Sequence, residues 1–486
     1  MKSMLLLLSI ALPLIGGARL LIRKPSGSRA RNIWCEAVAL LTSLLVWILL
    51  LSGGTDPVHV YTFTGDFSIN FFADGPSMLF AGMVSVMWPL VLIYAFSYME
   101  HSHHRNGFFA FYLMTYGITL GVAFAADLVT MYVFFEMLTL VTIPLVCHYQ
   151  DHDSLYAGRL YAAYTIGGAS LAFIAVIVAT MDGGSAFVYG GRIAGVFDKK
   201  LLLIAFLFGF FGFGAKAAVF PLFRWLPVAG VAPTPVTALL HAVAVVNSGV
   251  FAVARLTWYT FGPELLSGSY VQTICLLTAS FTLVFAALMA VRQRHLKRRL
   301  AYSTVSNLSY MIFGIMLLTP DGLAAGFAHM LFHGIIKITL FMCAGAFMHV
   351  TGNEYIYELN GVGRKMPYTF GFYTIGALSL TGIPLFCGFV SKLSLVLAGA
   401  AQGSAPAVIG TASLITAAFL CAIYTISISI RAFFPAKGTE RYQGGAADAD
   451  LRMLVPIGVF SFVNVLFGMF PGPIMGFLEK IAAGLI

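Results

Sequence analysis

Charged side chains are scarce in this sequence. Asp, Glu, Lys and Arg make up 10% of its 486 residues, whereas a soluble domain contains about 25%. Hydrophobic residues make up 59%, and the mean hydropathy is +0.90. This composition excludes an ordinary soluble domain. Apolar runs of about 20 residues, each long enough to cross a bilayer as a helix, recur along the chain. The sequence therefore predicts a multi-pass membrane protein.

Motifs for redox centres and metal sites are also missing. No haem, flavin or iron–sulfur motif occurs, so we expect no cofactor and no redox chemistry in this chain. The first apolar run lacks a small-residue cleavage site, and residues 4–22 are interpreted as a retained span. The cysteines show no CxxC spacing and fall in or beside apolar runs, which is typical of small buried side chains; they are Cys35, Cys147, Cys275, Cys343, Cys387 and Cys421.

The apolar runs predict an all-α polytopic fold of about fourteen membrane-spanning helices. We expect helices 1–3 in residues 1–106 and a five-helix repeat, helices 4–8, in residues 107–262. A second, inverted five-helix repeat, helices 9–13, would occupy residues 263–433, followed by a C-terminal loop and helix 14 in residues 434–486. The predicted spans are 3–22, 33–52, 77–98, 108–126, 128–147, 155–180, 201–226, 234–262, 269–291, 299–318, 322–349, 367–400, 405–433 and 453–476.

The basic residues are distributed unevenly between the two sides of this topology. Of the 28 Lys and Arg residues, 18 are assigned to the odd-numbered loops and 5 to the opposite side. Positive residues concentrate on the cytoplasmic side of membrane proteins, so both termini are predicted outside the cytoplasm, with the chain in a cell inner membrane. The RQRHLKRR run at 292–299 is interpreted as one such cytoplasmic loop, and we expect no nucleic-acid binding.

Four ionisable residues lie inside predicted spans. Glu136, Lys216, Lys337 and Lys392 occur in MYVFFEMLTL, FGAKAAVFPL, HGIIKITLFM and GFVSKLSLVL. A charge at bilayer depth costs several kcal/mol and is usually functional. Glu136 is the only acid predicted well inside a span. Opposite charges stabilise each other's ionised forms, so Glu136 and Lys216 are predicted to pair, and separating them would make the lysine a proton donor.

Two of the predicted spans contain prolines that would interrupt a helix. Pro221 and Pro227 follow Lys216, and Pro384 precedes Lys392. Proline removes a backbone donor, and the opened backbone is tolerated in a membrane only where protein or water satisfies it. Broken helices at equivalent positions of two repeats are a pointer to ion sites near the midplane. Two unrelated prolines in long helices are the alternative explanation.

Histidines accompany the lysines. His329, His333 and Lys337 recur every four residues and so lie on one face of a helix, where imidazole side chains suit a proton relay. Core hydrogen bonding and zinc binding are the alternatives, although the stripe lacks a further sulfur or carboxylate ligand, and we expect no metal site. The HSHH run at 101–104 is interpreted as a solvated loop.

Four sequence blocks resemble the antiporter-like subunits of respiratory complex I, membrane-bound hydrogenases, formate hydrogenlyases and multisubunit Na⁺/H⁺ antiporters. The blocks are KAAVFPLFRWLPVAGVAPTPVTALLHA, LKRRLAYSTVSNLSYM, HMLFHGIIKITLFMCAGAFMH and SLTGIPLFCGFVSKLSL. The resemblance runs from about residue 95 to 435 and implies fourteen helices with inverted repeats. It places the family's functional glutamate on Glu136, its lysines on Lys216 and Lys337, and its lysine or glutamate of the broken twelfth helix on Lys392.

The sequence departs from the family pattern at two places. Asn247 stands where many members have a lysine, and His241 would then take the central relay position. The loop that commonly reads D-x-K-R has His295 at its first position. The main relay is therefore predicted to comprise Glu136, Lys216, His241, His333, Lys337 and Lys392, with His329, Asn247, Arg255 and Asp127 as secondary candidates and helix breaks at Pro221 and Pro384.

These features predict a proton-translocating subunit, coupled or not to Na⁺, of a hydrogenase-type or complex I-like oxidoreductase complex. Its expected partners are other membrane subunits, including related antiporter-like ones, together with H⁺, Na⁺ and the lipid bilayer. A D-type subunit of an Na⁺/H⁺ antiporter without redox chemistry is the alternative. A structural subunit with an inactive relay and a stand-alone solute transporter fit the intramembrane charges less well.

Overall fold

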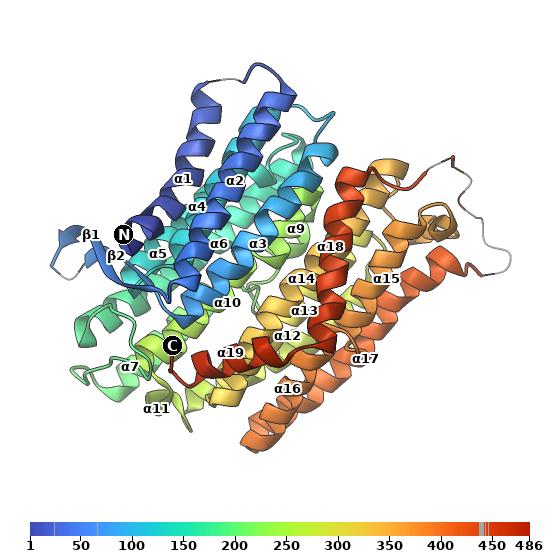
Figure 1. Cartoon of the computed structure of the whole chain (residues 1–486). Coiled ribbons are helices and arrows are strands. Elements are labelled where there is room, and N and C mark those ends of the chain that lie inside the picture. The colour runs from blue at the N-terminus through green and yellow to red at the C-terminus, as the bar shows by residue number, and fades with distance from the viewer. Residues whose placement is uncertain (24, 66, 437–441, 443, 446) are drawn as a thin grey trace.

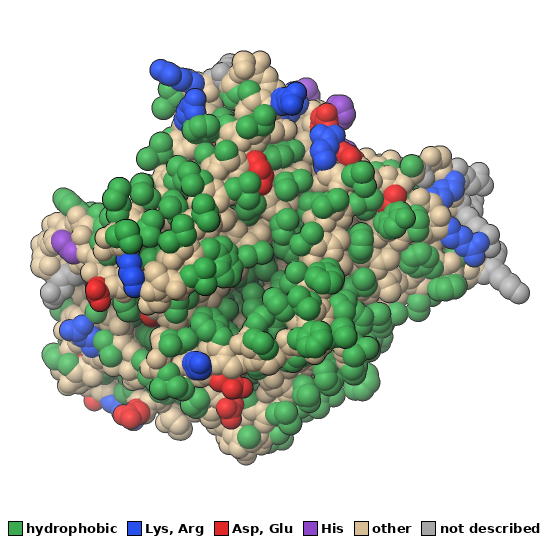
Figure 2. Space-filling model, in the orientation of Figure 1, with side chains coloured by type: hydrophobic (Ala, Val, Ile, Leu, Met, Phe, Trp, Pro, Cys, Tyr) green, Lys and Arg blue, Asp and Glu red, His purple; other side chains and the backbone are tan. Residues whose placement is uncertain are grey.

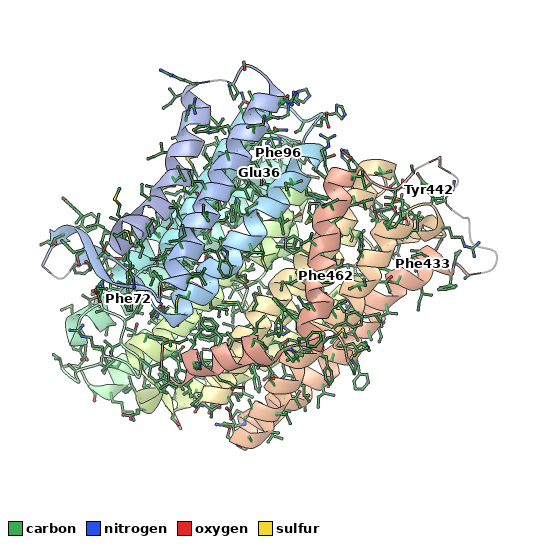
Figure 3. All side chains as sticks on the ribbon, in the orientation of Figure 1. Glu36, Phe72, Phe96, Phe433, Tyr442 and Phe462 are labelled. Carbon is green, nitrogen blue, oxygen red and sulfur yellow. The ribbon has the colours of Figure 1, made fainter. Side chains whose placement is uncertain are left out.

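The structure, a computed structural model, describes residues 1–486 apart from 24, 66, 437–441, 443, 446 and the side chain of His241. Long helices run side by side through the molecule (Figure 1). Apolar side chains cover most of the face shown in Figure 2, and charged side chains lie mainly toward its ends and edges. Large apolar side chains also project outward, such as Phe462 on the C-terminal side, which is 67% exposed (Figure 3). This distribution suits a protein surrounded by lipid.

The fold is mostly helical, as predicted, and the N-terminal part adds a β-hairpin that the sequence analysis did not predict. Strand β1 pairs with β2 in antiparallel register, and Phe72 N donates to Phe124 O at 2.7 Å. Aromatic and β-branched residues favour strands, and this signal in VHVYTFT was overlooked beside the long apolar runs. The elements are α1 (Lys2–Ile22), α2 (Ser28–Leu51), β1 (Thr55–Thr64), β2 (Phe67–Ala73) and α3 (Gly75–Tyr98).

The middle part contains the first interrupted helix. Helix α7 stops at Gly214, and the backbone turns before a helix resumes at Trp225. Trp225 Nε1 donates to Ala215 O at 2.8 Å, which satisfies a carbonyl freed by the break. The elements are α4 (Arg105–Ala123), α5 (Leu128–Val146), α6 (His152–Gly183), α7 (Lys199–Gly214), α8 (Trp225–Val228), η1 (Ala229–Val231), α9 (Thr234–Ala242), α10 (Val245–Arg255) and η2 (Leu256–Phe261).

The C-terminal part contains the second interrupted helix. The chain leaves α15 through Gly382, whose φ of +95° suits glycine, and passes Pro384 before α16 begins. The elements are α11 (Pro263–Leu266), α12 (Tyr270–Arg292), α13 (Leu296–Met316), α14 (Pro320–Thr351), η3 (Ile356–Leu359), η4 (Val362–Arg364), α15 (Pro367–Thr381), α16 (Cys387–Gln402), α17 (Ala405–Phe433), α18 (Leu451–Met469) and α19 (Gly472–Ala482).

The last predicted span, 453–476, is wrong at its end. Helix α18 stops at Met469, before Pro471, and α19 is a separate helix that lies across the neighbouring helices (Figure 1). Proline cannot continue the hydrogen bonding of a helix but suits the first turn of the next one. The sequence therefore contains the signal for this corner, which hydropathy alone does not register.

Ten helices in the described part of the chain are long and apolar enough to cross a membrane. Each of the fourteen predicted ranges contains helical residues, but α4, α7, α13 and the α15–α16 pair are not among the ten. The number fourteen therefore stays a prediction. Helix α14 is central, because it packs against α13, α15, α16, α18 and α9. Its central position explains why the side chains of its middle turns are buried.

Candidate functional site

Lys216 lies at the first helix break. Its side chain is fully buried, and its Nζ donates a hydrogen bond to Phe135 O. The ammonium group also lies 3.6 Å from the centroid of the Phe135 ring, a distance at which a cation is attracted to the ring face. The break after Gly214 thus places a buried lysine against α5.

Glu136, the residue after Phe135, is the nearest acidic partner for this lysine. Its side chain is half-buried, and its charge interacts with that of Lys216. Within the described residues, however, no ion pair joins the two groups, and Glu136 Oε1 is buried without a hydrogen bond. In this structure Lys216 therefore donates to the Phe135 carbonyl, next to Glu136, and the predicted Glu136–Lys216 ion pair is not formed among the described residues.

Lys337 lies at the centre of the bundle on α14. It is fully buried, its Nζ donates to Leu300 O at 3.0 Å, and it also donates to Ser303 Oγ. Both acceptors belong to α13, in the block LKRRLAYSTVSNLSYM. Hydrogen bonds from a charged donor are stronger than neutral ones, so these contacts support a lysine in this interior.

A chain of hydrogen bonds leads from Ser303 to the second break. Asn307 Nδ2 donates to Ser303 O at 2.7 Å, and Asn307 Oδ1 lies 3.2 Å from His329 Nε2. His329 Nδ1 lies 2.9 Å from Ser391 Oγ. All four side chains are buried. Each of these groups accepts or donates, so the chain is a polar path between α13, α14 and α16.

Lys392 is the residue after Ser391 and lies at the second helix break. Its Nζ donates to Leu380 O at 2.5 Å, a carbonyl near the end of α15, and lies 5.0 Å from the centroid of the Tyr310 ring. The side chain is 7% exposed. The lysine thus compensates a carbonyl at the interrupted end of α15, for which the residue four positions on, Pro384, has no backbone N–H to offer.

The remaining predicted relay residues, His333, His241 and Asn247, differ in their contacts. His333 is buried, with its ring centroid 5.9 Å from that of His329. The side chain of His241 lies outside the described residues, so its predicted role stays a prediction. Asn247, which stands in the family's lysine position, is buried and donates to Ala242 O at 2.7 Å.

Arg255 and Asp127, two of the secondary candidates, hold structural contacts. Arg255 Nη1 and Nη2 donate to Asp74 at 2.6 and 2.5 Å, which ties α10 to the start of α3. Asp127 caps α5 by accepting from Thr130 N at 2.7 Å. Both contacts explain these buried charges without a transport role.

Lys297 is a buried lysine that sequence reasoning placed in a loop. It is 4% exposed, and its Nζ donates to Ala232 O at 2.8 Å. The basic run around it obscured this position, because its neighbour Arg298 is exposed.

Glu36, on α2, is a second acid within a predicted span, and its Oε2 is buried without a hydrogen bond in the described structure. For Ser303 and Asn307, the signal was their spacing of four residues in an apolar helix.

A bundle of long apolar helices, with buried lysines at two helix breaks, defines the class of antiporter-like membrane subunits. Residues 125–420 match the family described as NADH:quinone oxidoreductase/Mrp antiporter, transmembrane. Residues 60–109 match the N-terminus of chain 5 of NADH-ubiquinone oxidoreductase (complex I). The first match covers more than half of the chain, and the chain belongs to this family.

Among its relatives is the Na(+)/H(+) antiporter subunit A1 of Staphylococcus aureus (strain Newman), 27% identical over 460 residues that cover 90% of this chain and 57% of the relative. The chain therefore spans little more than half the length of that relative. A chain of the membrane-bound sulfane sulfur reductase, an archaeal respiratory membrane complex, shares the fold with a TM-score of 0.86 at 24% identity, covering 98% of this chain and 97% of that one. A chain of the Mrp complex from Dietzia sp. shares it with a TM-score of 0.85 at 22% identity, covering 100% and 97%.

Proposed function

We propose that this chain moves protons, coupled or not to Na⁺, as one subunit of an energy-converting membrane complex. The observation that carries the proposal is the row of buried polar groups that joins Lys337 to the residue before Lys392. Lys337 donates to Ser303 Oγ, Asn307 donates to the backbone carbonyl of Ser303, and His329 bridges Asn307 and Ser391. Within this row the hydroxyls of Ser303 and Ser391 and the imidazole of His329 can each donate and accept, which suits proton movement. An inactive structural subunit has no need of it.

The relay works by changing which groups hold a proton. When Lys216 leaves Phe135 O and pairs with Glu136, the opposite charge favours its protonated form, and separation favours release. The proton then passes by way of His241, His333 and Lys337 to Lys392. The second break opens the backbone beside Lys392, which allows a hydrated path to one aqueous side.

We infer that residues 107–262 and 263–433 form two inverted repeats. The support is that each range contains an interrupted helix with a buried lysine beside the break. In each range, that lysine lies over an aromatic ring of the second long helix, Phe135 in α5 and Tyr310 in α13. A comparison of the two backbones after rotation about an axis in the membrane plane tests this inference.

The names of the relatives support a place in a complex. One relative is a subunit of an Na(+)/H(+) antiporter, and the two structural relatives come from an Mrp complex and a respiratory membrane complex. The partners would be other membrane subunits, some of them related to this chain. Hydrogenase-type and complex I-like complexes remain the main proposal, and a D-type antiporter subunit without redox chemistry is the alternative.

We further propose an inner-membrane location with both termini outside the cytoplasm. The uneven distribution of basic residues supports this orientation. Cysteines introduced at Gly195 and Gly444 should react from opposite sides of sealed membranes, with Gly195 reacting from outside. Reaction of both cysteines from one side would contradict the proposed topology.

Reconstitution of the purified complex into liposomes that contain a pH-sensitive dye tests the proposed function. The wild-type complex should move protons when its driving reaction or ion gradient is supplied. Lys337→Ala should abolish this movement, whereas Lys365→Ala, which changes a lysine outside the relay and the predicted spans, should not. Equal transport by the wild-type and Lys337→Ala complexes would instead support the structural-subunit alternative.

A further inference from the structure

A histidine-lined cavity lies where several connecting segments meet. Its volume is about 560 Å³, and its lining includes five histidines from the segment before α4, the end of α5 and the end of α14: His101, His103, His104, His148 and His349. The sequence suggested only a solvated HSHH loop. The structure adds His148 and His349 from segments that are distant in the sequence. Imidazoles gain and lose protons near neutral pH, so the cavity gathers groups that exchange protons with water.

The inner wall of the cavity leads to the start of α9. The ring of Tyr98, which lines the cavity, packs against His349 with centroids 5.2 Å apart. Thr234 Oγ1 donates to the Tyr98 hydroxyl at 3.2 Å. Thr234 is the first residue of α9, and the preceding turn contains Ala232. Thr234, which contacts the cavity wall, is therefore only two residues from Ala232, whose carbonyl accepts a hydrogen bond from Lys297.

Lys297 lies between this wall and the central lysine. Its Nζ donates to Ala232 O at 2.8 Å on one side. One helical turn further along α13, Leu300 O accepts from Lys337 Nζ at 3.0 Å. Lys297 is 4% exposed, and within the described residues it forms no ion pair with an acid. The charge of Glu354 acts on Lys297 from a distance, but a buried lysine that is not ion-paired is costly. A position between the cavity and the relay gives this lysine a functional reason to be there.

We propose that the histidine-lined cavity is the mouth through which protons reach the relay, and that Lys297 passes them from the cavity to Lys337. This inference rests on the proposed function. A protonated cavity histidine releases its proton to water and becomes neutral, and the neutral amine of Lys297 takes up a proton. Lys297 then gives a proton to the neutral amine of Lys337 and returns to its starting form, so charge is conserved at each step.

The histidines of the cavity differ in their burial and in their charged neighbours. Burial and the neighbouring His104 lower the pKa of His148 to about 4, so His148 stays neutral above that pH and accepts hydrogen bonds, as its Nε2 contact with Ser102 Oγ at 2.9 Å allows. His101, His103, His104 and His349 are exposed. Other ionisable groups at this end of the bundle include Tyr98, Glu100, Arg105, Tyr149, Asp151, His295, Glu354, Asp450 and Arg452.

A metal ion is a second use for clustered histidines. Among the described side chains, however, no three from His, Cys, Asp and Glu are arranged to hold one. The histidines line the cavity without converging on a point. Proton collection requires only exposure to a shared volume of water, and the geometry favours it.

Substitutions of Lys297 in the complete reconstituted complex separate a relay group from a structural anchor. Lys297→Gln should reduce proton transport by about 100-fold, the size expected for a lost proton-transfer group, with subunit assembly unchanged. Lys297→Arg should be equally impaired, because an arginine hydrogen-bonds a carbonyl but does not release its proton. Arg298→Gln, a change to the exposed neighbour, should transport normally. Normal transport by Lys297→Arg would overturn the role of Lys297.

A His101→Gln/His103→Gln/His104→Gln variant tests the cavity. On raising the pH on the cavity side from 6 to 8, its transport should fall about tenfold more steeply than that of the wild type, because histidines collect protons where free protons are scarce. His152→Gln, which changes a histidine 95% exposed outside the cavity, should follow the wild type. A wild-type profile for the triple variant would overturn the cavity's role.

The outcomes distinguish this inference from the proposed function. If Lys337→Ala abolishes transport while the Lys297 and histidine variants transport normally, only this inference fails. If the wild-type complex moves no protons, the proposed function fails too.

Discussion

The two helix breaks hold their lysines in similar ways but give them different neighbours. Lys216 and Lys392 each donate to a backbone carbonyl and lie over an aromatic ring, Phe135 or Tyr310. Glu136 stands beside the first lysine. Within the described structure the second lysine contacts no acid, and the residue before it ends a chain of uncharged hydrogen-bonding groups.

This difference separates two ways of controlling a proton. At the first break, the proposed relay uses attraction between opposite charges to hold the proton on Lys216, and such a pair is worth about 4 kcal/mol at 4 Å near a protein surface. At the second break, Lys392 and Lys337 are near enough to repel each other when both are charged. Arrival of a proton on one lysine therefore favours its departure from the other.

The loss of either lysine should have the largest effect. Lys216→Ala and Lys392→Ala should each reduce proton transport by about 100-fold or more, because each removes a relay group. Assembly should be retained, since neighbouring side chains such as Trp225 also support the first break. Transport by reconstituted complexes and subunit content by gel analysis check this. If only one of the two variants transports normally, the relay is confined to the half of the molecule that contains the other lysine.

Glu136→Gln should have the next largest effect, a decrease of about tenfold, which corresponds to a change of about 1.4 kcal/mol. The amide keeps the shape of the side chain but removes the charge that favours protonated Lys216. The pH dependence of transport should also shift. Glu264→Gln, at an exposed acid in α11, is the matched control. Wild-type transport by Glu136→Gln would remove the proposed difference between the two breaks.

His329→Gln should slow transport by about fivefold, the equivalent of one hydrogen bond of about 1 kcal/mol. His329 bridges Asn307 and Ser391, although the sequence ranked it below His333. Ser391→Ala should have a similar effect, and combining both changes should add little, because they interrupt the same path. Additive losses in a double-mutant cycle of transport rates would contradict a shared path.

The aromatic rings should have the smallest effects. Phe135→Leu should change the pH of half-maximal transport more than Tyr310→Leu, because the lysine lies 3.6 Å from the first ring centroid and 5.0 Å from the second. Each cation–π contact is worth about 0.5 to 2 kcal/mol. Tyr310→Phe keeps the ring and serves as the control for loss of the hydroxyl. Equal shifts for the two leucine variants would show that ring distance does not matter.

Charge and proline in apolar surroundings made the main features of the fold and the lysines predictable. The interruptions at Pro221 and Pro384 follow from the missing backbone donor, and the burial of Lys216, Lys337 and Lys392 follows from their apolar neighbours. The β-hairpin and α19 were missed because hydropathy over about 20 residues averages out strand alternation and a corner at Pro471. These elements depend on local backbone chemistry.

The polar links between the lysines depend on tertiary contacts. Ser303, Asn307 and Ser391 are ordinary residues in apolar helices, and only the packing of α13, α14 and α16 brings them to His329. Lys297 was misassigned for the opposite reason, since its run of basic neighbours is typical of a solvated loop. The turn that contains Ala232 buries Lys297. The basic residues next to Lys297 in the sequence do not indicate that this distant turn lies there.

Phe135 and Glu136 are consecutive residues of one rigid helix turn, and this sets a time scale. In the proposed relay, Lys216 would exchange the carbonyl for the carboxylate by rotating its own side chain, without the helix displacements that take microseconds or longer. The exchange would therefore need only a local motion at the first break. The rate-limiting step of the whole complex would then lie in larger events, such as hydration of the breaks or movements transmitted from its partners.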